Sequence, residues 1–152
     1  MIMQLQKAII DRYNQTIMSG NDYYNVVNSC YGFGYGYGYG YRPCILYAGT
    51  APESKTYPYC VLHIYLSDTE QFSDYVFKTY NVEFKIYSNA INNTQEIFNI
   101  TENIILAFEG VEFLIGDLKS NCMEQVSDFP LVLLPDQKTY QQVIRFKIGL
   151  GQ

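Results

Sequence analysis

The hydrophobic positions near the N-terminus follow helical spacing. Residues 4–17 place apolar side chains three or four positions apart along the chain, at Leu5, Ala8, Ile9, Tyr13 and Ile17. This spacing lines one face of a helix, and Ser19 with Gly20 supplies a stop signal. We therefore expect an amphipathic helix as the first element.

Two segments in the middle of the chain alternate between apolar and other residues. From Tyr57 to Leu66 the even positions are apolar, namely Cys60, Leu62, Ile64 and Leu66. After a polar turn at residues 67–74, residues 76–87 alternate again, with Tyr80, Val82, Phe84 and Ile86 inward and Thr79, Asn81, Glu83 and Lys85 outward. A period of two is typical of a strand with one core face. The sequence predicts two strands that pair as neighbours.

A second helical pattern runs from Asn92 or Asn93, either of which can cap it, to Gly110, which is placed to end it. The expected buried stripe consists of Ile97, Phe98, Ile104, Ile105 and Phe108. Ile100 and Leu106 fall towards the edges of that face. Because the apolar surface is wider than one stripe, we expect part of it to meet another subunit.

The C-terminal third reads as further strands. Residues 111, 113 and 115 are apolar and alternate, residues 118–127 are ambiguous, and Asp128 to Lys138, with two prolines, reads as a loop. The closing segment 140–150 is the clearest strand, with Ile144, Phe146, Ile148 and Leu150 on one face. Strands interrupted by one central helix, with another helix leading, predict an α+β fold whose sheet is covered on one face. At 152 residues, the chain fits one domain over 1–152.

Charge and composition narrow the possible functions. Ten basic and fifteen acidic side chains give a net charge of −5 without a basic run, whereas proteins that neutralise phosphates need clustered Lys and Arg. We expect no specific nucleic-acid binding, and an acidic surface is compatible with DNA passing without adhering. No apolar stretch approaches the roughly 20 residues of a membrane span, so no membrane contact is expected.

The cysteines are expected to be buried thiols. Cys30, Cys44, Cys60 and Cys122 lie too far apart for a metal-binding CxxC pair. The N-terminal segment lacks the small-residue cleavage site of a signal peptide, which favours a reducing compartment over one that forms disulfides.

No catalytic or metal-binding pattern stands out. The single histidine, His63, lies three residues from its nearest thiol, Cys60, and an odd separation in a strand sends the two side chains to opposite faces. The acidic residues Asp68, Glu70 and Asp74 lack the glycine and the closing glutamate of a calcium loop, and a solvated turn is the expectation. We therefore expect neither an enzyme nor a bound cofactor or metal.

An aromatic and glycine tract fills residues 31–41 with the sequence YGFGYGYGYGY. In an extended conformation its rings would share one face, and rigid aromatic side chains are enriched at interfaces. The alternative is a flexible surface loop, because the glycines raise the entropy cost of ordering it. Only Arg42 lies beside the tract, which disfavours stacking on single-stranded nucleic acid.

Taken in order, these segments resemble the tail-completion or tail-terminator proteins of long-tailed bacteriophages, the family that includes tail-to-head joining proteins. The similarity lies in the succession LQKAIIDRY, ILYAGTAPESKTYPYCVLHIYLSD, VEFKIYSNA, TQEIFNITENIILAF and YQQVIRFKIGL. Residues 20–42 depart from the family pattern and read as an insertion.

The resemblance implies a small antiparallel sheet packed against two helices, in a virion protein assembled in the host cytoplasm. It implies a homo-oligomeric ring of six copies that terminates the tail tube and joins it to the head connector. The partners would be the major tail tube protein and the connector or neck proteins, with DNA passing through the lumen.

Subunit contacts then fall on loops and on apolar surfaces. The candidates are the loop Ala48 to Thr56, the loop Asp128 to Lys138, the second helix and the tract, with these residues: Tyr31, Phe33, Tyr35, Tyr37, Tyr39, Tyr41, Ile100, Leu106, Pro52 and Pro130. One alternative is a head-closure or neck ring protein. Another is a small-molecule or peptide-binding α+β domain, with Tyr57, Tyr59 and Tyr65 lining a site.

Overall fold

The computed structural model describes residues 1–18, 42–91 and 93–151. The predicted stop at Ser19 and Gly20, the aromatic and glycine tract, its six rings and Cys30 lie outside these residues. Arg42 is the first described residue after the gap.

The described chain contains two α-helices and eight strands. Helix α1 covers Ile2–Tyr13 and continues into a π-helical turn, η1, over Asn14–Met18, and helix α3 covers Gln95–Phe108. The strands are β1 (Ile45–Ala48), β2 (Tyr59–Gln71), β3 (Val76–Ser88), β4 (Leu114–Ile115), β5 (Leu118–Lys119), β6 (Glu124–Asp128), β7 (Val132–Leu133) and β8 (Tyr140–Gly151).

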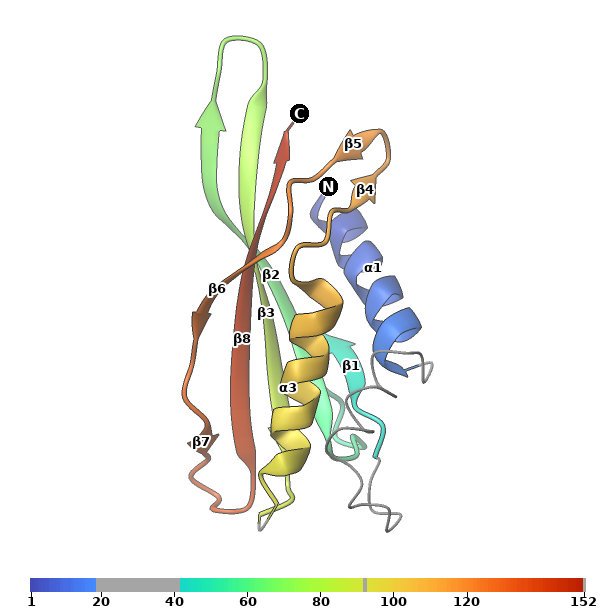
Figure 1. Ribbon diagram of the computed structural model, residues 1–152, viewed down its shortest axis with the longest axis vertical. Coiled ribbons are helices and arrows are strands. Elements are labelled where there is room, and N and C mark those ends of the chain that lie inside the picture. Colours follow the sequence, from blue (N-terminus) through green and yellow to red (C-terminus); the bar gives the residue numbers. More distant parts are fainter. Residues whose placement is uncertain (19–41, 92, 152) are drawn as a thin grey trace.

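One sheet dominates the molecule (Figure 1). Its strand order is β1-β2-β3-β8-β6, with β7 also pairing with β8, and β4 and β5 form a separate hairpin. Only β1, which is parallel to β2, departs from antiparallel pairing. The predicted pairing of the two middle strands is confirmed, since β2 and β3 form a long hairpin.

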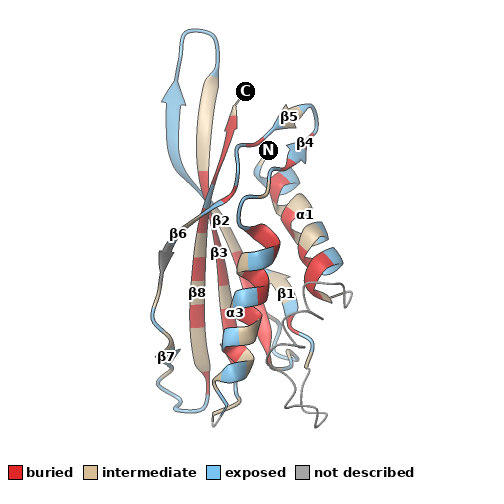
Figure 2. Ribbon diagram, viewed as in Figure 1, coloured by how far each residue is buried: buried red, intermediate tan, exposed pale blue. Residues whose placement is uncertain are grey.

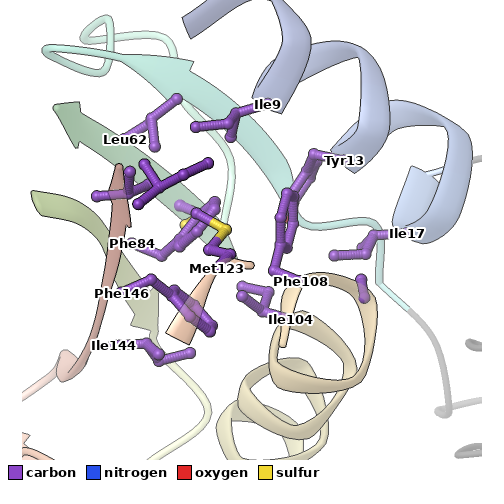
Figure 3. Packing of buried hydrophobic residues seen from close by; sticks show 14 of the residues in the cluster. Ile9, Tyr13, Ile17, Leu62, Phe84, Ile104, Phe108, Met123, Ile144 and Phe146 are labelled. Atoms are coloured by element: carbon purple, nitrogen blue, oxygen red, sulfur yellow. The ribbon is translucent and has the colours of Figure 1, made fainter. Parts of the chain in front are cut away.

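The two helices lie side by side on one face of the sheet (Figure 1). The core fills the space between the helices and the sheet (Figure 3). Phe84 is fully buried at its centre, with ring centroids 5.0 Å from Phe108, 6.0 Å from Phe146 and 6.4 Å from Tyr13. Figure 2 shows buried residues along β3, β8 and both helices. The α+β prediction is confirmed, with a mostly antiparallel sheet and two helices.

The inward positions of the first helix and the two long core strands are confirmed. Leu5, Ile9, Tyr13 and Ile17 are buried, Ala8 is partly buried against them, and all the predicted inward residues of β3 and β8 are buried. No described helix has the length and apolar character needed to cross a membrane.

Helix α3 buries part of the predicted stripe, since Ile97, Ile104 and Phe108 lie in the core as expected. Phe98 is 42% exposed and Ile105 only partly buried, whereas Ile100 and Ala107 lie in the core. Apolar residues surround most of this helix, so periodicity alone does not select the buried side. Its contacts with β3, β8 and η1 decide which side is buried.

The prediction of a polar turn at residues 67–74 is wrong for most of that range. β2 continues through Ser67 to Gln71, and only residues 72–75 connect it to β3. A register shift between Leu66 and Asp68 lets the polar residues pair with β3, because strand pairing needs backbone partners rather than apolar side chains. Leu66, predicted inward, is 49% exposed.

Three shorter elements also differ from the sequence expectations. β1 lies in a segment that showed no alternation, and it forms by pairing with the first half of β2. The expected strand over residues 111–115 is reduced to β4, and the ambiguous stretch becomes β5 and β6. The predicted loop Asp128 to Lys138 carries the short strand β7.

Candidate assembly surfaces

The outer face of the sheet, opposite the helices, carries polar and aromatic side chains of β2 and β3. Residues that pair directly across strands share a face, so Tyr59, Val61 and His63 of β2 lie beside Tyr87, Lys85 and Glu83 of β3. The expectation that Cys60 and His63 point to opposite faces agrees with this register, since Cys60 pairs with the core residue Ile86 and is fully buried.

A shallow hollow of about 290 Å³ lies on this outer face, at the end where β2 begins. Its walls are the loop residues 49–51 together with Lys55, Tyr59, His63, Lys85 and Tyr87. Tyr59 and Tyr87 stack with ring centroids 4.8 Å apart, and the Lys55 ammonium lies 5.7 Å from the centre of the Tyr59 ring. We call it the basic hollow.

The basic hollow concentrates positive charge on an acidic chain. Within the described ranges, Lys55, His63 and Lys85 form no ion pair with an acidic side chain. Burial, followed by the neighbouring Tyr57 and Tyr87, raises the pKa of the Tyr59 phenol to about 12, so the phenol stays neutral near pH 7. The hollow therefore presents two lysine ammonium groups and the partly exposed ring of Tyr87, a combination suited to anionic groups.

The nearest buried acid on this face is already paired. Glu83 Oε2 accepts hydrogen bonds from Arg145 Nε at 2.8 Å and Nη2 at 2.6 Å, and the Arg145 guanidinium lies 4.9 Å from the centre of the Phe129 ring. Tyr65, predicted to line a ligand site with Tyr57 and Tyr59, instead directs its hydroxyl to Glu83 at 3.3 Å. Glu83 lies on the outward face as predicted, but it is only 8% exposed because these groups cover it.

At the other end of the sheet, the β2–β3 hairpin projects beyond the rest of the molecule (Figure 1). We call residues 67–79 the arm. The rings of Phe72 and Tyr75 stack at its tip with centroids 4.7 Å apart, and both are almost half exposed. The acidic residues Asp68, Glu70 and Asp74 are exposed there too. Asp68 and Glu70 lie on β2 rather than in the expected turn.

The predicted interface residues take different positions. Leu106 is 48% exposed on α3, and Pro52 and Pro130 are exposed in their loops. Ile100, by contrast, is 7% exposed and packs in the core of its own chain, so it is not available as a surface residue in the single chain. The six tract rings lie outside the described residues.

The three described cysteines divide into two classes. Cys44 and Cys60 are buried free thiols as predicted, whereas Cys122 is exposed, contrary to the prediction. Desolvation raises the pKa of Cys44 to about 12 and that of Cys60 well above its usual value. Across the described part of the chain, no cluster of three or more histidine, cysteine or acidic side chains is arranged to hold a metal ion.

Sequence reasoning missed the basic hollow and the aromatic tip of the arm. The hollow needs Lys55 from a loop to meet Lys85 from β3, residues that are 30 positions apart in the sequence. The pairing of Val61 with Lys85 was the one available signal, because it follows once the register of the two strands is known.

The fold is similar to that of a chain in the virion of a native gene transfer agent (GTA) particle. The TM-score is 0.60 at 7% sequence identity, and the match covers 70% of this chain and 78% of that chain. No family model and no curated protein sequence matches the chain. The likeness is therefore one of fold, over most of both chains.

Proposed function

We propose that the protein is a structural subunit of a phage-like virion, and that copies of it form a ring of about six subunits that ends the tail tube and joins it to the head connector. The observation that carries the proposal is the likeness in fold, over most of both chains, to a subunit of a gene transfer agent virion. The order of elements that resembles tail-terminator proteins supports the same role independently.

The distribution of surface features supports assembly rather than catalysis. Within the described residues the prominent surface features are the basic hollow, the acidic arm and exposed apolar side chains such as Leu106 on α3 and Leu114, 73% exposed, on β4. Large exposed apolar residues favour contact with other proteins. The single histidine faces the hollow without a nucleophile from its own strand beside it.

The edges of the sheet are also suited to subunit contacts. Among the described strands, β1 has a partner on one side only, and β6 and β7 end the opposite edge. Unpaired strand edges accept further strands unless they are protected. A ring needs two different patches that meet between neighbours, and the chain offers distinct patches at opposite ends and edges.

The proposal is tested by the mass and shape of the purified protein. Light scattering and negative-stain images should show a closed ring of about six copies, alone or on tail tubes. In a phage that encodes the chain, removing its gene should give unjoined heads and tails. A protein that stays monomeric at all concentrations and does not bind tail tubes would contradict the proposal, and rings bound only to heads would favour the head-closure layer.

A further inference from the structure

The outer face of the β2–β3 hairpin has opposite charge at its two ends. The basic hollow, with Lys55, His63 and Lys85, lies at the end where β2 begins. The arm at the other end carries Asp68, Glu70 and Asp74 against one base, Lys78. A single chain therefore presents a cationic patch and an anionic patch on one long hairpin.

The register places two of the arm's acids on the same face as the basic hollow. Val61 pairs with Lys85, whereas beyond the shift after Leu66, Asp68 pairs with Thr79 and Glu70 with Phe77. Odd-numbered residues of β3 share one face, so Asp68 and Glu70 lie on the side of Lys85 and Glu83. Without the shift they would lie on the side of the core.

The two patches cannot touch within one chain. β2 runs from Tyr59 in the hollow to Gln71 at the arm, and twelve residue steps at roughly 3.3 Å each separate the ends by about 40 Å. β2 pairs with β3 along almost all of its length, and β3 pairs with β8 from Ser88 to Phe77, so the two ends of the hairpin stay far apart. At this separation the acidic arm and the basic hollow can contact each other only when they belong to different copies of the chain.

We propose that the arm tip of one copy binds in the basic hollow of a second copy. The carboxylates of Glu70 and Asp74 meet Lys55 and Lys85, and the stacked pair Phe72–Tyr75 packs on Tyr87, which is partly exposed and stacks on the buried Tyr59. The inference rests on the proposed function, because it supplies the contact between neighbours that a ring requires.

Neighbouring acids do not cancel the attraction. Glu83 is held by Arg145 at 2.6 Å and is nearly buried. Glu53, in the loop that supplies Lys55, is exposed and is not one of the residues that line the hollow. Electrostatic complementarity of this kind accelerates and orients association, and salt weakens it.

Charge reversal tests the contact. K55E/K85E reverses the hollow and E70K/D74K reverses the tip, and each variant should weaken self-association by about tenfold or more in sedimentation velocity at low salt. The variant carrying all four changes restores the net charge of the wild type and should regain association. Mixing the two double variants should also restore it, because each then meets a partner of opposite charge.

A matched control separates local from general charge effects. K7E/K138E changes the net charge by the same amount, but Lys7 lies on α1, on the helix side of the sheet, and Lys138 in the exposed turn before β8. This variant should associate like the wild type. Circular dichroism and thermal unfolding of each variant check that the fold is retained.

The outcomes distinguish the contact from the ring. If rings form and neither reversal weakens them, or if the combined variant and the mixture fail to recover, the contact is wrong while the proposed function stands. A strict dimer that responds to the reversals supports the contact and contradicts the ring. A folded protein that stays monomeric at all concentrations contradicts both.

Discussion

Gly149 of β8 shows how one missing side chain shapes the base of the arm. A Cβ atom at this position would collide with the ring of Phe77 on β3 and come within 3.0 Å of the Asn121 amide nitrogen. Asn121 holds the same backbone, since the Gly149 N–H donates to its side-chain oxygen at 2.6 Å. The ring therefore lies directly over the β8 backbone and covers it.

Gly149→Ala should destabilise the protein by about 1–3 kcal/mol, because overpacking displaces Phe77 or the strand. Urea unfolding measures the loss. Gly151→Ala is the matched control, since its Cβ would lie 3.6 Å from the same ring, an ordinary contact. Equal stability of the two variants would show that the Phe77 ring moves aside without cost.

The buried thiols Cys44 and Cys60 make stability depend on alkaline pH. Burial raises the pKa of Cys44 from 9.0 to about 12 and that of Cys60 in the same direction. Their contribution is fully present below the unfolded value near pH 9, and it declines as the pH rises, because the unfolded chain then releases the protons first. The decline should approach about 1.4 kcal/mol per pH unit for each thiol.

Urea unfolding between pH 8 and 11 measures this slope. C44A/C60A should unfold more easily at every pH and show a shallower decline than the wild type. Cys122→Ala removes an exposed thiol and should leave the slope unchanged. An identical decline in all three proteins would assign the alkaline loss to other groups.

At the scale of elements, a polar clamp holds the chain as it returns from the undescribed segment 19–41. Arg42 Nε donates to Glu96 Oε2 at 2.8 Å and its Nη2 to Glu96 Oε1 at 2.6 Å, and the buried Ser88 hydroxyl donates to Glu96 Oε1 at 2.7 Å. These contacts join the approach to β1, the end of β3 and the first turn of α3. Tyr13 adds a second tie, donating its hydroxyl to the Cys44 carbonyl at 2.6 Å.

Arg42→Lys should cost about 1 kcal/mol in the free energy of unfolding, because an ammonium cannot reproduce the two parallel bonds of the guanidinium. Partial exposure of Arg42, with 40% of its side chain accessible, keeps the loss small. Lys7→Ala removes an exposed ion pair with Asp11 and should change stability by less than about 0.5 kcal/mol. A similar loss of stability in both variants would show that the Arg42–Glu96 contact contributes no more than an exposed ion pair.

At the scale of the whole molecule, the fold provides a sheet covered by two helices and a projecting arm. The helices cover one face of the sheet, and the arm extends past them (Figure 1), with its β2 half exposed along its length (Figure 2). The two described ends of the gap are tied together through Tyr13 and Cys44. The segment 19–41, which contains the tract, therefore connects two parts of the chain that the fold joins.

Deleting residues 31–41 should leave the thermal unfolding temperature within a few degrees of the wild-type value, because the hydrogen bond from Tyr13 to the Cys44 carbonyl already joins the chain on the two sides of the segment 19–41. Particle assembly in a complementation assay then reports on the tract itself. Loss of joined particles with a stable subunit assigns the tract to an interface, whereas normal joining makes it a dispensable loop. Unfolding of the subunit would show that the core depends on the tract.

The sequence by itself determined the elements whose periodicity is strong. Alternation in β3 and β8 and the spacing in α1 marked their buried residues correctly, because a residue such as Phe84 or Ile9 is fixed to one face by local geometry. The same rule separated Cys60 from His63. It also established the α+β class, since the order of periodic segments limits the layers they can form.

Only the tertiary structure decided features that depend on a distant partner. β1 exists because β2 lies beside it, the buried side of α3 follows from its contacts with the sheet, and the arm extends because polar residues of β2 find backbone partners on β3. The basic hollow joins Lys55 to Lys85 across a loop and a strand. Contacts between residues far apart in sequence leave no local period, so the surfaces proposed for assembly emerge only from the folded chain.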